Sequence, residues 1–131
     1  MVIDTSAILA IFLAESERAQ FLELITEAET RLISAVNVFE TGIVLEARRG
    51  EAAGREFDLF LSCAKLDVVP VDAEQVETAR VAWRKYGKGR HPAALNFGDC
   101  FAYALAKMLG EPLLAKGADF GRTDIEMCQG F

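Results

Sequence analysis

The chain lacks several features that would assign it to a common class of protein. It has only three cysteines, an odd number without the close paired spacing of a zinc or redox site, so we expect reduced thiols, at least two of them in the core. No apolar run approaches the roughly eighteen residues of a membrane-spanning helix. The apolar start has neither a basic segment nor a small-residue cleavage site. We therefore expect a soluble, cytoplasmic protein that does not bind membranes.

Basic residues are also scarce. The chain has 14 Lys and Arg against 20 Asp and Glu, which gives a formal net charge of −6. A protein that coats nucleic acid through its phosphates usually carries a basic footprint, so the composition argues against that class. It does not exclude a nuclease that holds phosphate through metal ions. Two local basic stretches could contact RNA through Arg48, Arg49, Lys85, Lys88 and Arg90, although solvated helix ends and loop surface explain them almost as well.

Length and apolar periodicity predict one α/β domain. At 131 residues and 52% hydrophobic content, the chain is long enough for a single core, and we expect one domain over residues 1–131. Short buried strands are predicted at 1–4, 31–36, 66–71 and 112–115, with a further edge strand in the tail, 124–131. Helices are predicted at 5–13, 16–28, 37–47, 51–64, 72–86 and 96–109, with a loop at 86–92. This alternation indicates a three-layer α/β/α fold around a parallel sheet of four to five strands.

Four acidic residues fall where a buried strand ends or a helix begins: Asp4, Glu40, Asp99 and Asp119. In open α/β sheets the ligand site lies outside the carboxyl ends of the strands. Carboxylates that are far apart in the sequence can therefore converge at that edge. We expect the four acids to share one site.

Each acid also has a local structural interpretation. Asp4 suits a helix N-cap, and Asp119 suits a surface turn. Glu40 and Asp99 each lie at the third position after an asparagine, Asn37 and Asn96, which is the spacing of a capping box. For Glu40 the capping role is locally the stronger interpretation. One shared site nevertheless accounts for all four acids more economically than four separate caps and turns.

Gly98, just before Asp99, adds a further observation. A glycine lowers helix propensity, so its presence in the first turn of a predicted helix makes sense if another group must approach the backbone closely there.

The chemistry that needs such a cluster is the binding of Mg²⁺ or Mn²⁺. These hard ions prefer oxygen ligands, and Mg²⁺ is usually held by one or two carboxylates, water and substrate phosphate. Asp4 and Asp99 are the expected direct ligands, and Glu40 and Asp119 the expected supporting acids. Without metal, the like charges should raise the pKa of at least one carboxylate. Such a site can hydrolyse a phosphodiester with no histidine or cysteine nucleophile.

Five sequence features together resemble the PIN-domain ribonucleases, in particular the VapC toxins of type II toxin–antitoxin systems. They are Val2-Ile3-Asp4-Thr5-Ser6, Glu40, Asn96-Phe97-Gly98-Asp99-Cys100, Lys116-Gly117-Ala118-Asp119-Phe120 and Thr123-Asp124-Ile125. The resemblance spans almost the whole chain. It implies a PIN-like fold, a Mg²⁺- or Mn²⁺-dependent endoribonuclease, a VapB-like antitoxin as partner, and a homodimer.

The resemblance also implies a division of roles. Asp4 and Asp99 match the metal ligands, and Glu40 and Asp119 match the other catalytic acids. Supporting positions around them are Thr5, Ser6, Asn96 and, less securely, Asp124. The competing interpretation is a noncatalytic PIN-like module that binds RNA or protein. Retention of all four acids disfavours it, because loss of catalysis would leave little reason to keep like charges together.

Overall fold

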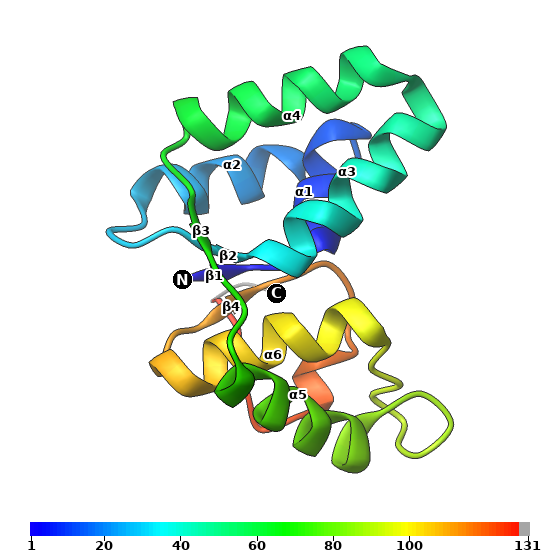
Figure 1. Ribbon diagram of the computed structural model, residues 1–131. Helices are drawn as coiled ribbons and strands as arrows, with labels where there is room; N and C mark the ends of the chain where they lie inside the picture. The colour runs from blue at the N-terminus through cyan, green and yellow to red at the C-terminus, as the bar shows by residue number, and fades with distance from the viewer. Residues whose placement is uncertain (129–131) are drawn as a thin grey trace.

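The computed structural model describes residues 1–128, whose strands form one parallel sheet (Figure 1). Its strands are β1 (Val2–Ile3), β2 (Leu32–Ser34), β3 (Asp67–Val69) and β4 (Leu113–Leu114), in the order β3-β2-β1-β4. Every neighbouring pair is parallel, so each connection must cross over the sheet. The predicted parallel sheet is confirmed, with four strands.

Helices cover both faces of this sheet, as Figure 1 shows. They are α1 (Thr5–Phe12), α2 (Arg18–Glu27), α3 (Ala35–Arg49), α4 (Glu51–Cys63), α5 (Ala73–Tyr86) and α6 (Phe97–Leu109), with a short 3-10 helix, η1 (Phe120–Arg122). Helices α1 to α4 lie on one face, and α5 and α6 lie on the other. The predicted three layers are therefore confirmed. Among residues 1–128, no helix has the length and apolar character needed to cross a membrane.

The two central strands divide the core into two clusters. Val2 and Leu113 pack with the α5 and α6 side, whereas Ile3 and Leu114 pack with the α1 to α4 side. All four side chains are fully buried, as expected for strands whose successive residues point to opposite faces. The Asp4 backbone N–H donates to the Leu114 carbonyl (2.9 Å), so the chain stays paired with β4 as it leaves β1.

Helix α3 begins three residues earlier than predicted, counted from one N-cap to the other. Its N-cap is Ser34, whose hydroxyl accepts from the Val36 N–H (3.3 Å). The predicted Asn37 cap, and with it the capping-box interpretation of Glu40, is therefore wrong. Asn37 lies inside the helix and is fully buried, so its amide is available for contacts with other elements.

Helix α6 begins and ends where its sequence signals predict. Asn96 caps α6, and Gly110 ends it in the left-handed conformation (φ 64°), as expected of a helix C-terminus.

The predicted tail strand is represented by one isolated parallel bridge between Met127 and Leu113. Residues 129–131 of that prediction lie outside the described residues. Two of the three cysteines, Cys100 and Cys128, are buried as expected.

Candidate active site

The fold brings the four predicted acids to the carboxyl edge of the sheet. Asp4 follows β1, Glu40 lies in the second turn of α3, Asp99 lies in the first turn of α6, and Asp119 follows β4. The charges of Asp99 and Glu40 act on Asp4, and those of Glu40 and Asp119 act on Asp99. The acids therefore form one electrostatically linked group, defined here as the acid cluster.

Asp4 is the most buried member of the acid cluster. Its side chain is 2% exposed, and its Oδ2 accepts from the Ser6 N–H (3.0 Å), which caps α1. Its Oδ1 is enclosed and has no hydrogen-bond partner among the described residues. Burial above all, reinforced by the charges of Asp99 and Glu40, raises the pKa of Asp4 to about 7, although the bonds to Ser6 act in the opposite direction. Asp4 is thus both a helix cap and a carboxylate with one unsatisfied oxygen.

Glu40 enters the acid cluster directly over Gly98. A Cβ atom placed on Gly98 would collide with both carboxylate oxygens of Glu40. The close approach predicted from Gly98 is therefore present, and the approaching group is an acid of the cluster. No side chain larger than hydrogen fits at residue 98 while Glu40 keeps this position.

Asp99 serves two purposes at the start of α6. Its N–H donates to Asn96 Oδ1 (2.9 Å), and its Oδ2 accepts from the Asn96 N–H (2.9 Å), which completes the capping box. Burial is the main cause that raises its pKa, with Glu40 and Asp119 adding to it and the bond from Asn96 opposing it. The capping interpretation and membership of the acid cluster therefore hold together.

The neighbours of Asp4 connect it to two other elements. Ser6 Oγ accepts from the Lys116 N–H (2.9 Å), which joins α1 to the segment that leads from β4 to Asp119. Thr5 Oγ1 donates to the Asn37 carbonyl (3.4 Å) and accepts from the Asn37 amide (3.1 Å). Sequence reasoning assigned Asn37 to a cap, so this contact was missed.

Asp124 faces a different set of partners. Tyr103 Oη donates to its Oδ1 (2.6 Å), and Lys107 Nζ donates to its Oδ2 (2.8 Å). These bonds, the one from Lys107 first, lower the pKa of Asp124. Tyr103 and Lys107 lie one and two turns beyond Asp99 along α6, so Asp124 fastens the tail to that helix, away from the start of α6.

The predicted RNA contacts separate into two groups. Arg48 and Arg49 end α3, roughly 12 Å along the helix axis from Glu40, and Arg49 donates to the Phe12 carbonyl (3.1 Å). Lys85 is exposed in the last turn of α5 and lines a pocket with Tyr103 and Asp124. Lys88 and Arg90 are exposed in the loop between α5 and α6, where Arg90 lies over the Trp83 ring. Lys88 and Arg90 therefore precede the start of α6, whereas Lys85 lies on the Asp124 side of that helix.

The cluster offers only oxygen donors. Among residues 1–128, no three Asp, Glu, His or Cys side chains lie close enough together to enclose an ion. Mg²⁺ does not need three, because it is commonly held by one or two carboxylates together with water and phosphate oxygens. The unsatisfied Asp4 Oδ1 and the surrounding like charges suit a hard divalent cation.

Comparisons with known proteins agree with this geometry. The model of the PIN domain family matches residues 1–126. Ribonuclease VapC30 of Mycobacterium tuberculosis is 52% identical over 125 residues, which cover 95% of each chain. The chain belongs to the VapC ribonucleases of the PIN-domain family. Ribonuclease VapC of Mycolicibacterium smegmatis, another member, is 52% identical over 126 residues, 95% of this chain and 97% of the relative.

Solved structures of the family share the fold at low sequence identity. VapC20 of Mycobacterium tuberculosis, described as a sarcin-ricin loop cleaving toxin, has a TM-score of 0.78 and 20% identity and covers 97% of both chains. VapBC2 of Rickettsia felis, bound to a fragment of its promoter DNA, has a TM-score of 0.72 and 17% identity over 96% of this chain and 94% of that one. These structures confirm the fold, and the family model and the curated relatives confirm the family predicted from the sequence.

Asp4→Asn should stabilise the metal-free protein at high pH. Because the pKa of Asp4 is raised in the folded state, the free energy of unfolding falls as pH rises from about 4 to about 7, and an amide avoids this loss. In EDTA we expect Tm to rise by about 5 °C at pH 8, with a smaller gain at pH 5. Asp58→Asn, at an exposed carboxylate, should show no such gain. A lower Tm for Asp4→Asn at pH 8 would contradict the account.

Gly98→Ala should destabilise the protein because the new methyl group displaces Glu40. We expect a loss of about 1–3 kcal/mol in the free energy of unfolding, measured by urea denaturation. Gly42→Ala is the matched control. It also lies inside a helix, but its Cβ would meet only Glu46 at 3.9 Å, so alanine should be neutral or stabilising there. Equal effects of the two substitutions would show that Glu40 does not need Gly98.

Proposed function

We propose that this VapC ribonuclease is a Mg²⁺- or Mn²⁺-dependent endoribonuclease that acts as the toxin of a toxin–antitoxin pair. The observation that carries the proposal is the buried Asp4 Oδ1, which has no hydrogen-bond partner among the described residues while the charges of Glu40 on α3 and Asp99 on α6 act on the same carboxylate. Burying an unsatisfied carboxylate beside other acids is unfavourable without a cation. A bound cation best explains why the chain holds these carboxylates together.

Each acid has a distinct proposed role. Asp4 and Asp99 would hold the cation, through carboxylates whose pKa burial and neighbouring acids raise in the metal-free chain. A bound divalent cation supplies Lewis acidity to water and to the phosphodiester. Glu40, held over Gly98, would accept hydrogen bonds from the attacking water and orient it, while Asp119 lies at the exposed side of the cluster. The proposed reaction is hydrolysis of an RNA phosphodiester bond.

The substrate class rests on the relatives. The curated relatives carry the name ribonuclease, and RNA is therefore the proposed substrate of this chain. Lys85, Lys88 and Arg90 are proposed to contact the RNA backbone, because they are exposed basic residues in the last turn of α5 and in the loop that leads into α6. A noncatalytic RNA-binding module, the second candidate, would bind the same RNA without cutting it.

Cleavage assays with purified protein test this proposal. We expect RNA cleavage in Mg²⁺ or Mn²⁺ and none in EDTA. Asp4→Asn and Asp99→Asn should each lower the rate by at least about 100-fold while the far-ultraviolet circular dichroism stays unchanged. Asp124→Asn is the matched control, because Asp124 binds Tyr103 and Lys107 instead, and it should keep most of the activity. Full activity in either of the first two variants would contradict the assignment.

We also propose a VapB-like antitoxin as the partner. Solved neighbours from Klebsiella pneumoniae and Salmonella typhimurium are a toxin–antitoxin complex and a DNA-bound VapBC, with TM-scores of 0.69 and 0.72. A homodimer is proposed as well, from the same family resemblance. Both assemblies must form on surfaces that are exposed in the single chain.

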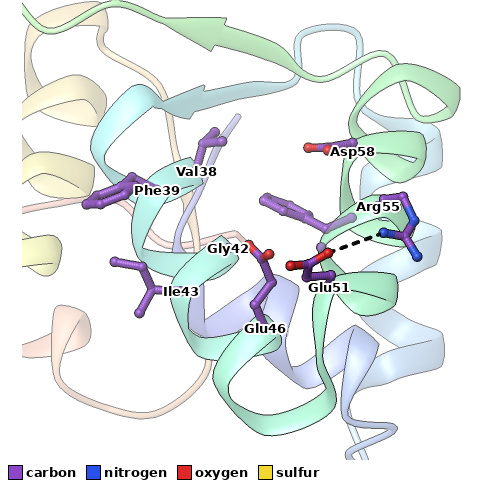
Figure 2. Close-up of a pocket in the computed structure, with 10 residues that line it drawn as sticks. Val38, Phe39, Gly42, Ile43, Glu46, Glu51, Arg55 and Asp58 are labelled. Carbon is purple, nitrogen blue, oxygen red and sulfur yellow. Dashed lines mark ion pairs between the residues drawn. The ribbon is translucent and has the colours of Figure 1, made fainter.

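A groove of about 360 Å³ between α3 and α4 is the proposed antitoxin site (Figure 2). Phe39 and Ile43 are 72% and 52% exposed beside it. Its carboxylates are Glu46, Glu51 and Asp58, and its one basic residue, Arg55, pairs with Glu51 (4.0 Å).

This composition defines the kind of segment that fits. An apolar surface flanked by excess negative charge suits a helix or strand that presents apolar and basic side chains. The groove begins beside Phe39, the residue before Glu40, so a segment bound there lies next to the acid cluster.

Ile43→Lys should weaken antitoxin binding without affecting catalysis. A buried ammonium among apolar partner side chains should lower the affinity by at least about 10-fold, measured by isothermal titration calorimetry with the proposed VapB-like antitoxin. The RNA cleavage rate of the free toxin should stay unchanged. Val81→Lys is the control, because Val81 is also an exposed apolar residue on a helix but lies on α5, on the opposite face of the sheet. If Val81→Lys weakens binding and Ile43→Lys does not, the groove is not the site.

A further inference from the structure

Asn37 is fully buried, and its side-chain amide donates hydrogen bonds to residues outside its own helix. It lies in the first turn of α3, and its Nδ2 donates to Thr5 Oγ1 (3.1 Å) and to the Gly98 carbonyl (3.2 Å). Thr5 Oγ1 returns a bond to the Asn37 carbonyl (3.4 Å). One side chain thus joins the start of α1 and the start of α6 to α3.

The partners of Asn37 are the immediate neighbours of the acids. Thr5 follows Asp4 in the sequence, and Gly98 precedes Asp99. Glu40 lies one turn beyond Asn37 on the same helix, and its carboxylate covers Gly98. The amide therefore touches every element that carries one of these three acids.

These three acids need a neutral connection. Like charges held close together in a poorly solvated place repel one another, and each acid sits on a separate element that could move apart. An amide adds no charge, and its two N–H groups can satisfy two acceptors at once, which neither a carboxylate nor a hydroxyl can do. The Asn37 Oδ1 is buried with no hydrogen-bond partner among the described residues. The two bonds that its Nδ2 donates therefore come at the cost of an unsatisfied acceptor.

We propose that Asn37 is a positioning residue that fixes the spacing of Asp4, Glu40 and Asp99 for cation binding. The inference rests on the proposed function, because it assumes that these acids hold Mg²⁺ or Mn²⁺. Asn37 contacts neither the cation nor the substrate. It acts through Thr5 and Gly98, as groups that orient metal ligands commonly do.

Binding of Mn²⁺ in the absence of RNA separates positioning from general stability. Asn37→Leu keeps the branched shape and removes both donors, although its methyl groups are larger than the amide atoms that they replace, and Asn37→Ser, which is smaller and keeps one donor, serves if the leucine variant does not fold. We expect the affinity for Mn²⁺, measured by electron paramagnetic resonance on the metal-free full chain, to fall by about 10-fold or more for Asn37→Leu and less for Asn37→Ser. Cleavage should show a lower kcat with little change in KM for RNA, and added Mn²⁺ should recover part of it.

Thr41→Val provides the matched control. Thr41 is fully buried one turn further along α3, and its hydroxyl has no hydrogen-bond partner among the described residues, so valine removes a buried polar group of similar size. Its Mn²⁺ affinity should stay within about twofold of wild type. Wild-type Mn²⁺ affinity in both Asn37 variants would overturn the positioning role while leaving the nuclease proposal intact. Failure of the wild-type chain itself to bind Mn²⁺ would overturn both.

Discussion

Carboxylates held close together at one edge of the sheet repel one another, and the backbone and side chains around them are arranged to accommodate that repulsion. Asp4 is buried with one oxygen unsatisfied among the described residues, and Glu40 and Asp99 add like charge beside it. The surrounding backbone is arranged to tolerate this. The Asp4 N–H stays paired with β4, Ser6 donates to the Asp4 carboxylate, and Gly98 leaves room for Glu40. A divalent cation would offset the repulsion that remains.

Helix α3 connects catalysis to partner binding in this account. One of its faces turns Asn37 and Glu40 toward α1 and α6, and another presents Phe39 and Ile43 to the groove shared with α4. Residues three and four apart share a face of a helix. Asn37 and Glu40 therefore lie on one face of α3, and Phe39 and Ile43 lie on another, so residues for cation binding and for antitoxin binding alternate within one short segment. A partner that shifts α3 would therefore alter the acid cluster even without contacting a carboxylate. Because α3 is capped by Ser34 and begins at Ala35, Asn37 is a helical residue and not a cap.

Much of this organisation could be predicted from the sequence. The alternating strands and helices, the capping box at Asn96 and the close approach at Gly98 all arise from local patterns and were confirmed by the structure. The start of α3 could not be predicted, because Ser34 and Asn37 are both good N-cap residues and only tertiary contacts decide between them. The same holds for Asp124, whose partners on α6 are distant in the sequence. Local signals thus located the acids and the cap at Asp99, but not the contacts that Asn37 and Asp124 make with other elements.

Crystals of the wild-type chain grown with Mn²⁺ would locate the ion through its anomalous scattering. We expect an anomalous difference peak beside the carboxylates of Asp4 and Asp99, with Asn37 still joining Thr5 to Gly98. An acid cluster that stays free of Mn²⁺ in crystals soaked at millimolar concentration, or an ion bound only elsewhere on the chain, would contradict this expectation.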